Sequence, residues 1–250
     1  MFTDLSRLII FAHRGASVYA PENTLASFGL ALSQGADAIE LDARLSADHQ
    51  VVVIHDATVD RTTDGHGSVA QLSSAELRSL DAGGSFSEKY RGERIPFLGE
   101  VFEAVGKRMF INIELKDYSV QLDQLVENVC ALVKKHGLEK RVIFSSFLAS
   151  SLKKARHLLP EVPRGLLASK GWKGAWARSF GFTFGEYTAL HPYLTDVTQQ
   201  QVVRAHRLQR VVNVWTVNKA EDVVRLDHWG VDGIYTDDPQ AAMRALGRSS

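Results

Sequence analysis

The stretch Leu8-Ile9-Ile10-Phe11-Ala12-His13-Arg14-Gly15 decides the fold expected for this chain, because an apolar run ends abruptly in an imidazole, a guanidinium and a glycine. A second apolar segment carries Glu40-Leu41-Asp42. Residues i and i+2 of a strand point to the same face, so Glu40 and Asp42 should converge on one side. A histidine, an arginine and paired carboxylates at strand ends are the components of a metal-assisted phosphoryl-transfer site. These residues therefore indicate an enzyme that acts on phosphate.

Short β-rich runs alternate with helical patterns along most of the 250 residues. Strands are expected over residues 8–13, 38–45, 51–56, 110–115, 142–147, 164–168, 187–191, 211–217 and 232–236. Helices are expected over residues 22–34, 98–106, 119–136, 149–158, 198–208, 219–229 and 238–246. Such alternation predicts an α/β fold of parallel strands joined by helical crossovers, with polar residues emerging at the carboxyl ends of the strands.

One connection is too short to be a crossover. A parallel crossover needs about a dozen residues, whereas only residues 46–50 separate two of the expected strands. Strand 51–56 should therefore run antiparallel to strand 38–45, which places His55 roughly opposite Leu41 and beside the two carboxylates. The other eight strands predict a TIM-type (β/α)8 barrel with this one extra antiparallel hairpin strand.

Residues 57–97 do not fit the alternation. They contain two glycine-bearing turns and one short helical piece near residues 74–80, which is typical of an insertion. No linker rich in proline, glycine or serine divides the chain. We therefore expect a single domain over residues 1–250, with the insertion at 57–97 lying over the barrel mouth.

The composition excludes several classes of protein. A formal net charge of zero and a pI near 7.1 provide no general electrostatic reason to bind nucleic acid or an acidic membrane surface. We thus expect neither nucleic acid nor stable membrane association, and a small-molecule substrate. The single cysteine, Cys130, excludes an internal disulfide and fits a reducing compartment. Because the apolar run at 8–12 is too short for a signal peptide, the expected location is cytoplasmic.

Three strand ends and the hairpin carry the candidate chemistry, namely His13 with Arg14, Glu40 with Asp42, Glu114 with Lys116, and His55. Three carboxylates without a cysteine ligand make an all-oxygen site, which suits Mg²⁺ or Ca²⁺ rather than zinc, with Mn²⁺ as a further candidate. Arg14 and Lys116 suit the non-bridging oxygens of a phosphate. Two histidines supply a base for an attacking hydroxyl and an acid for a departing alkoxide.

Other polar and aromatic residues have competing interpretations. Asn23 belongs to a helix start that capping alone would explain, or it positions groups of the site as part of a βα loop. Trp215, near the end of an expected strand, is either core packing or a wall for the substrate. The remaining histidines fall mostly in turns or helices and are expected to be solvated: His49, His66, His136, His157, His191, His206 and His228.

The order and spacing of the motifs resemble those of the glycerophosphodiester phosphodiesterase family. The motifs are His13-Arg14-Gly15, Pro21-Glu22-Asn23-Thr24, Glu40-Leu41-Asp42, His55-Asp56 and Glu114-Leu115-Lys116, and the resemblance continues through Val214-Trp215-Thr216-Val217-Asn218 to Gly233-Ile234-Tyr235-Thr236-Asp237. The resemblance thus covers nearly the whole chain. It implies a TIM-barrel phosphodiesterase that releases sn-glycerol 3-phosphate and an alcohol from glycerophosphodiesters.

The resemblance also implies roles for the site residues. Glu40, Asp42 and Glu114 would bind the divalent ion, His13 and His55 would be acid and base, and Arg14 and Lys116 would hold phosphate. The glycerol 2-hydroxyl would act as an internal nucleophile and form a cyclic phosphate that water then opens. For Trp215, the resemblance favours the substrate wall.

Two other functions compete with this one. A lysophospholipase D-type enzyme would share the core of the site but would need an apolar surface for an acyl chain. A barrel used only for binding would lack at least one of the seven groups, and none is missing. The residues leave open the alcohol, the metal, the oligomeric state and which histidine is the acid, although we favour His55 as the acid.

Overall fold

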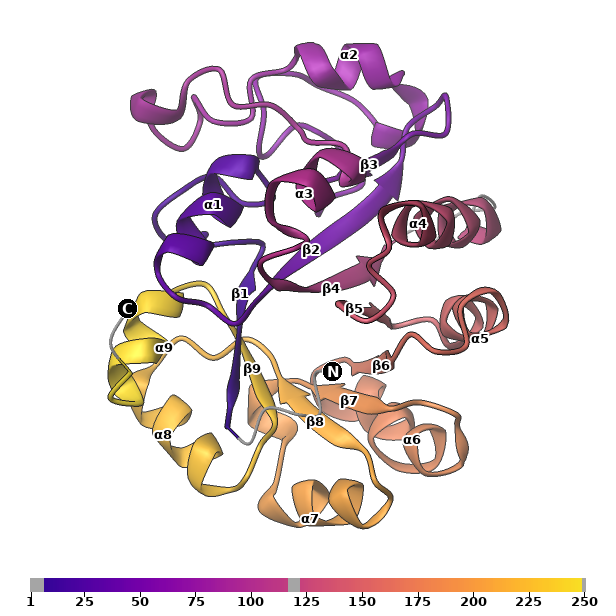
Figure 1. Cartoon of the computed structure of the whole chain (residues 1–250), viewed down its shortest axis with the longest axis vertical. Helices are drawn as coiled ribbons and strands as arrows, with labels where there is room; N and C mark the ends of the chain where they lie inside the picture. Colours follow the sequence, from indigo (N-terminus) through magenta and orange to yellow (C-terminus); the bar gives the residue numbers. More distant parts are fainter. Residues whose placement is uncertain (1–6, 117–121, 249–250) are drawn as a thin grey trace.

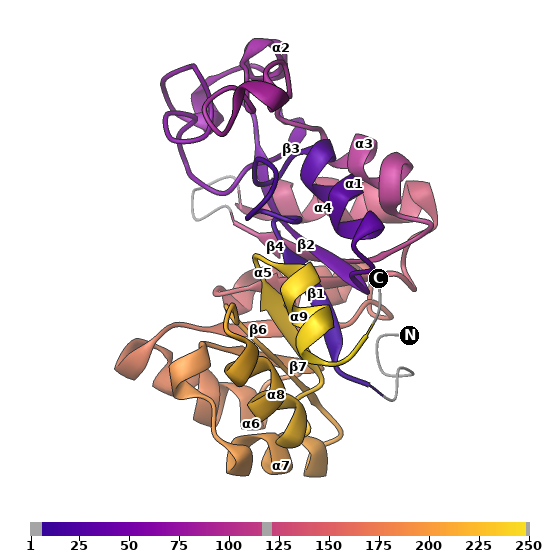
Figure 2. The same cartoon turned by 90° about the vertical axis from the view of Figure 1, so that its left-hand side faces the viewer.

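The computed structural model describes residues 7–116 and 122–248, which form a closed barrel of parallel strands (Figure 1, Figure 2). The eight barrel strands are β1 (Ile9–His13), β2 (Ala38–Leu45), β4 (Phe110–Leu115), β5 (Val142–Ser146), β6 (Arg164–Ala168), β7 (Ala189–Pro192), β8 (Val211–Val214) and β9 (Gly233–Thr236). Each strand pairs in parallel with the next in this order, and β9 pairs with β1 to close the ring. The expected TIM-type barrel is confirmed.

The extra strand β3 (Val51–Val53) runs antiparallel to β2, as the short connection predicted. Val53 pairs with Ala43, a register that places position 55 opposite position 41. The strand ends earlier than expected, because the chain then leaves the sheet to begin the insertion. Arg44 secures this departure, since its Nε and Nη2 donate to the His55 carbonyl oxygen at 2.9 and 2.7 Å.

Helices surround the strands in Figure 1, and most lie where the sequence predicted them. They are α1 (Leu25–Ser33), α3 (Leu98–Val105), α4 (Leu122–His136), α5 (Ala149–Leu158), α7 (Gln199–Arg207), α8 (Ala220–His228) and α9 (Pro239–Ala245). Among the helices in the described ranges, none has the length and apolar character needed to cross a bilayer.

The crossover from β6 to β7 contains helical turns that the sequence analysis did not predict. It holds a 3-10 helix at Gly171–Gly174, a π-helix at Ala177–Gly181 and the short α6 (Phe182–Phe184). Most of its aromatic side chains point to solvent rather than to the core. The apolar pattern that normally marks the buried face of a helix therefore marks an exposed face in this segment.

Strand side chains alternate between two apolar layers. Ile10 and Ala12 of β1 pack in the main core between the sheet and the helices, whereas Ile9 and Phe11 pack inside the barrel. Phe11 stacks on Tyr235 of β9 with ring centroids 4.7 Å apart. Because apolar side chains fill the interior near the starts of the strands, the charged side chains gather at the opposite, carboxyl end.

Residues 57–97 have a small apolar core of their own. Its members in the insertion are Val59, Val69, Leu77, Ala82 and Ile95, and they pack with Val52 and Ile54 of the hairpin. The helical piece expected near residues 74–80 is α2 (Ser74–Ser79), capped by Ser73 and Glu76. The insertion is therefore attached to the extra strand through shared packing.

His191 is a correction to the expectation that the other histidines are solvated. It lies on β7 inside the barrel and is fully buried. Its Nε2 lies 3.1 Å from Asn213 Nδ2, and its Nδ1 lies 3.2 Å from Tyr235 Oη. Burial lowers the pKa of His191 to about 3, so the ring is neutral and accepts from the Asn213 amide. A Cβ at Gly165 would lie 2.2 Å from the ring, which explains the glycine facing it.

We predict that His191 makes the fold less stable in acid. The unfolded ring takes up a proton near pH 6.5, whereas the folded ring does so only near pH 3. Between these values the unfolded state holds more protons, so the free energy of unfolding falls as the pH is lowered, by up to about 1.4 kcal/mol per pH unit. Urea unfolding from about pH 7 down to about pH 4 should show a steeper loss for the wild type than for His191→Gln. Equal slopes would contradict the assignment.

Candidate active site

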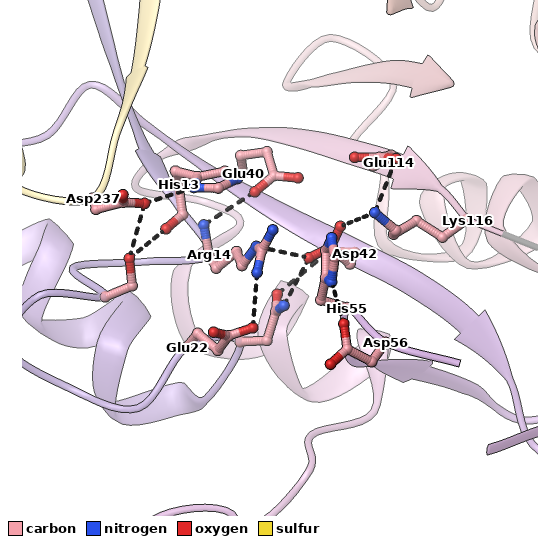
Figure 3. Close-up of polar contacts among 12 residues, drawn as sticks. His13, Arg14, Glu22, Glu40, Asp42, His55, Asp56, Glu114, Lys116 and Asp237 are labelled. Atoms are coloured by element: carbon pink, nitrogen blue, oxygen red, sulfur yellow. Dashed lines mark hydrogen bonds and ion pairs between the residues drawn. The ribbon is translucent and has the colours of Figure 1, made fainter. Parts of the chain in front are cut away.

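Charged side chains surround a cavity at the carboxyl end of the barrel (Figure 3). The cavity has a volume of about 210 Å³. Its lining residues are His13, Arg14, Glu40, His55, Asn112, Glu114, Lys116, Ser145, Phe147, Leu167, Trp215 and Tyr235. Of the site residues predicted from the sequence, all but Asn23 and Asp42 line the cavity. Asn23 and Asp42 each contact Arg14, which does line it.

Strand register brings the three carboxylates together. Asp42 on β2 pairs directly with Glu114 on β4, and Glu40 lies two residues before Asp42 on the same face of its strand. One oxygen atom of each carboxylate lies within 4.8 Å of the others, and all three residues are buried. The geometry thus concentrates three negative charges where water has little access.

Two cations lie against this carboxylate triad, which consists of Glu40, Asp42 and Glu114. Lys116 Nζ is 3.4 Å from Asp42 Oδ1 and 3.2 Å from Glu114 Oε1, the latter an ion pair without hydrogen-bond geometry. Arg14 Nε is 3.4 Å from Asp42 Oδ2. Because Arg14 is also shared with Glu22 at 3.0 Å, the positive charge does not fully balance the triad.

The carboxylates respond differently to the same burial. Burial, together with the adjacent Asp42 charge, raises the pKa of Glu40 to about 8. Burial also acts to raise the pKa of Asp42, but Lys116 and Arg14 outweigh it and hold the pKa of Asp42 well below its usual range. For Glu114, burial raises the pKa despite the opposing charge of Lys116. Near neutral pH, Glu40 is therefore the carboxyl group that carries a proton.

Arg14 and Asn23 orient the triad from the loop that follows β1. Both have a left-handed backbone, with φ of 57° and 58°. The Arg14 amide donates to Glu40 Oε2 at 3.0 Å, and Asn23 Nδ2 donates to Asp42 Oδ2 at 2.8 Å. The helix cap is the neighbouring Thr24, so capping does not explain Asn23. Asn23 holds Asp42 in place and is not among the residues that line the cavity.

His13 is held by the carboxylate of Asp237, the residue that directly follows β9. Its Nδ1 lies 2.6 Å from Asp237 Oδ1, which leaves Nε2 for the cavity. Asp237 Oδ2 in turn accepts from Asn218 Nδ2 at 2.6 Å. Burial acts to lower the pKa of His13, but the hydrogen bond to Asp237 and the charge of Glu40 outweigh it and raise the pKa above its ordinary value.

His55 has a similar partner in a different setting. Its Nδ1 lies 2.6 Å from Asp56 Oδ1, and Asp56 Oδ2 accepts from Arg61 Nε at 2.6 Å. Burial lowers the pKa of His55, and together with the charges of Lys116 and Arg14 it outweighs the opposing effects of Asp42 and Asp56. The two histidines are therefore shifted in opposite directions.

A chain of ion pairs behind the cavity was not found from the sequence. Arg61 donates to both Glu22 oxygens at 2.8 Å, and Glu22 also accepts from Arg14 at 3.0 Å. With Asp56, these residues connect His55 to Arg14. Asp56 follows His55 directly and Glu22 precedes Asn23. Their position beside predicted site residues was the only feature of the sequence that could have indicated a role for them.

The apolar wall of the cavity includes Trp215. Its Nε1 donates to the His191 carbonyl oxygen at 2.7 Å, which fixes the indole. The ring lies edge-on to Phe147 at 5.8 Å and to Tyr193 at 5.1 Å. Trp215 is half-buried and lines the cavity, so it forms a wall rather than part of the sealed core.

The donor set suits a hard divalent cation. Three carboxylates converge, and Glu114 Oε1 is a buried oxygen that accepts no hydrogen bond in the described part of the chain. Oxygen donors of this kind are the ligands of Mg²⁺, Ca²⁺ and Mn²⁺. The residues present therefore fit such an ion.

Comparisons with known proteins agree with this geometry. Residues 13–241 match the model of the glycerophosphoryl diester phosphodiesterase family. A glycerophosphodiester phosphodiesterase of Caldanaerobacter subterraneus is 41% identical over 241 residues, which cover 96% of this chain and 98% of that protein.

Solved structures give the same result. A phosphodiesterase from Oleispira antarctica, in complex with the product sn-glycerol-3-phosphate, is 33% identical, with a TM-score of 0.86 and 96% of each chain covered. A glycerophosphodiester phosphodiesterase from Agrobacterium tumefaciens is 31% identical, with a TM-score of 0.83, covering 95% of this chain and 99% of that one.

We predict that the affinity of the triad for Mg²⁺ or Ca²⁺ increases with pH. Because a proton on Glu40 leaves only near pH 8, a bound cation must displace it below that pH. Calorimetric titration between about pH 6 and about pH 9 should show tighter binding at higher pH. Glu40→Gln should bind more weakly with a flatter pH dependence, while Glu103→Gln on the outer face of α3 should match the wild type. Affinity independent of pH would contradict the prediction.

Proposed function

The chain belongs to the glycerophosphoryl diester phosphodiesterase family and is an enzyme of that class. From this premise we propose that it uses a divalent cation and two histidines to convert glycerophosphodiesters into sn-glycerol 3-phosphate and an alcohol. One observation supports the proposal above others. The buried carboxylate triad lies between two histidines, each of which has a carboxylate partner of its own. Such a set provides both charge stabilisation and two proton-transfer groups.

Glu40, Asp42 and Glu114 would hold the cation, and when bound it supplies positive charge toward the phosphoryl oxygens. Lys116 and Arg14 line the cavity beside the triad and contribute further positive charge to the non-bridging oxygens. Mg²⁺, Ca²⁺ and Mn²⁺ all suit this donor set.

We assign His13 as the acid and His55 as the base, the reverse of the preference drawn from the sequence. Asp237 is hydrogen-bonded by the neutral amide of Asn218, so its charge remains available to stabilise a protonated His13. Asp56 shares its charge with Arg61 at 2.6 Å and stabilises a protonated His55 less. A pair of groups whose environments favour opposite protonation states is suited to acid–base catalysis.

In the proposed reaction, the glycerol 2-hydroxyl attacks phosphorus while the base takes its proton. The bond from phosphorus to the alcohol oxygen breaks, and the acid protonates that oxygen. Water then opens the cyclic phosphate with the two histidines in exchanged roles. The lining residues support an internal nucleophile, because among them no serine or cysteine is hydrogen-bonded to His13 or His55.

The cavity has the size and polarity for a glycerol phosphate. Its volume is about 210 Å³, and Asn112 Oδ1 is a buried acceptor without a hydrogen-bond partner among the described residues. A glycerol hydroxyl would satisfy this atom. The complex of the Oleispira antarctica relative with sn-glycerol-3-phosphate supports the same substrate class. A lysophospholipase D-type activity would require the apolar side of the cavity, formed by Phe147, Leu167 and Trp215, to accept an acyl chain.

We also propose that the chain is one domain whose insertion borders the barrel mouth. Arg61 of the insertion contacts Glu22, and the Tyr90 hydroxyl donates to the Tyr19 carbonyl oxygen at 2.9 Å. A second cavity of about 190 Å³ lies between the insertion and the loop after β1, with Phe86 in its wall. The buried single cysteine, Cys130, remains the support for a cytoplasmic location.

The first test concerns the histidines. His13→Ala and His55→Ala should each lower kcat by at least about 10² on a glycerophosphodiester, because each removes a proton-transfer group. A nitrophenyl ester, whose leaving group needs no acid, should restore turnover of His13→Ala but not of His55→Ala. The assay is release of sn-glycerol 3-phosphate, with cation binding measured in parallel.

Cation binding should be largely retained in both variants, and His157→Ala on the surface of α5 should behave as the wild type. Near-normal turnover of both cavity variants would show that the histidine pair is structural. Full activity after thorough chelation would contradict the role of the cation.

The second test concerns the insertion. Deleting residues 57–97 would expose Val52 and Ile54 and disturb their packing. A single substitution therefore tests the insertion without this effect on the fold. Phe86→Ala should alter the ratio of kcat/KM between diesters of small and bulky alcohols by about threefold to tenfold. The melting temperature should not change, because Phe86 is 43% exposed. Val224→Ala, at an exposed apolar site on α8, is the control, and an unchanged ratio for Phe86→Ala would place the alcohol elsewhere.

A further inference from the structure

The crossover from β6 to β7 presents a stripe of exposed aromatic side chains. They recur at every fourth position of a largely helical segment, and their exposed fractions are 83% for Trp172, 58% for Trp176, 69% for Phe180 and 77% for Phe184. Side chains four residues apart on helical turns share one face. We call these four residues the aromatic stripe. The other side of the segment, at Ala177 and Phe182, packs in the core.

The aromatic stripe is unusual for the surface of this protein. Its members are the four most exposed large apolar side chains among the described residues. Phe180 and Phe184 stack on each other at 5.9 Å, so these two rings form one contiguous apolar surface. Contiguous exposed apolar patches mark surfaces that contact another molecule or a membrane.

The charged residues within the segment that carries the aromatic stripe are basic, and the acidic residues beside it, Glu186 and Asp196, are paired with Arg156 and Arg178. Residues 169–185 contain Lys170, Lys173 and Arg178 and no acidic residue, although the whole chain is neutral. Arg178 pairs with Asp196 at 3.0 Å, while Lys173 extends from the surface. Two lysines thus add positive charge at the start of the stripe.

The aromatic stripe begins at the cavity end of the barrel and runs along its side toward the amino ends of the strands, where Arg210, which directly precedes β8, lies over the Phe182 ring at 4.9 Å. The segment begins just after Leu167, which lines the cavity. Lys170 Nζ lies 5.4 Å from the centre of the Tyr193 ring, and Tyr193 contacts the cavity wall residue Trp215 at 5.1 Å.

We propose that residues 170–184 dock this side of the barrel on an anionic lipid surface. A helical segment with tryptophan and phenylalanine on one face and lysines beside it suits the headgroup region of a bilayer, where indole rings are enriched. A second copy of the chain is the poorer occupant, because a two-fold contact through this patch would bring like-charged lysines together. The inference goes beyond the phosphodiesterase activity and does not rest on it. It also departs from the expectation of no stable membrane association. That expectation was based on the net charge of the whole chain, which does not show how charge is distributed over the surface.

Vesicle co-sedimentation tests the proposal with two lipid mixtures. The full chain should partition onto vesicles of equal phosphatidylglycerol and phosphatidylcholine, and much less onto phosphatidylcholine alone. Trp172→Ala/Phe184→Ala should weaken partition by at least about tenfold, since two large apolar side chains no longer insert. Lys173→Ala should weaken it by about fivefold on anionic vesicles only, the contribution typical of one cation near a charged surface.

Leu158→Ala and Val224→Ala alter exposed apolar side chains outside the stripe and should leave partition unchanged. All variants should retain wild-type melting temperature and turnover of a soluble diester, because the stripe is exposed and does not line the cavity. Failure of the wild type to bind anionic vesicles would overturn the proposal, as would equal binding by the stripe variant. A dimer in light scattering that the stripe substitutions dissociate would assign the patch to a second copy and overturn it as well.

Discussion

Three buried carboxylates within 4.8 Å of one another are the constraint on which the rest of the site depends. Like charges so close in a poorly hydrated cavity repel, and the protein offsets this only in part. Lys116 and Arg14 contact Asp42, and the Arg14 amide contacts Glu40. The remaining imbalance leaves Glu40 protonated near neutral pH and gives the triad its tendency to take up a cation.

The insertion takes part in this charge balance. Arg61 lies within it and binds Asp56 and Glu22, so the partner of His55 and the partner of Arg14 share one guanidinium. His55 and Arg14 are therefore coupled through a segment outside the barrel. Asp237, which directly follows β9, is paired with no arginine or lysine among residues 7–116 and 122–248, and this difference separates the environments of the two histidines.

Charge is distributed unevenly although the chain as a whole is neutral. The cavity gathers three carboxyl groups beside two cations, whereas the charged side chains of residues 169–185 are all basic and lie among exposed aromatic rings. The cavity lies at the carboxyl end of the strands, the end where connecting loops can vary without disturbing the barrel, and the basic aromatic segment starts from that end. The charged groups of the cavity thus lie at one end of the barrel, the apolar packing of Ile9 and Phe11 lies toward the other end, and the proposed lipid contact lies along the side.

Local sequence determined the barrel, the hairpin and the convergence of the triad, because strand periodicity decides which face a side chain occupies and five residues allow only a tight turn. It did not reveal that His191 lies inside the barrel, that the β6–β7 crossover is helical, or that Arg61 reaches Glu22 across 39 positions. These features depend on contacts between segments that are far apart in the sequence and meet only in the folded chain. Periodicity acts within a segment, and only the tertiary structure decides what each face meets.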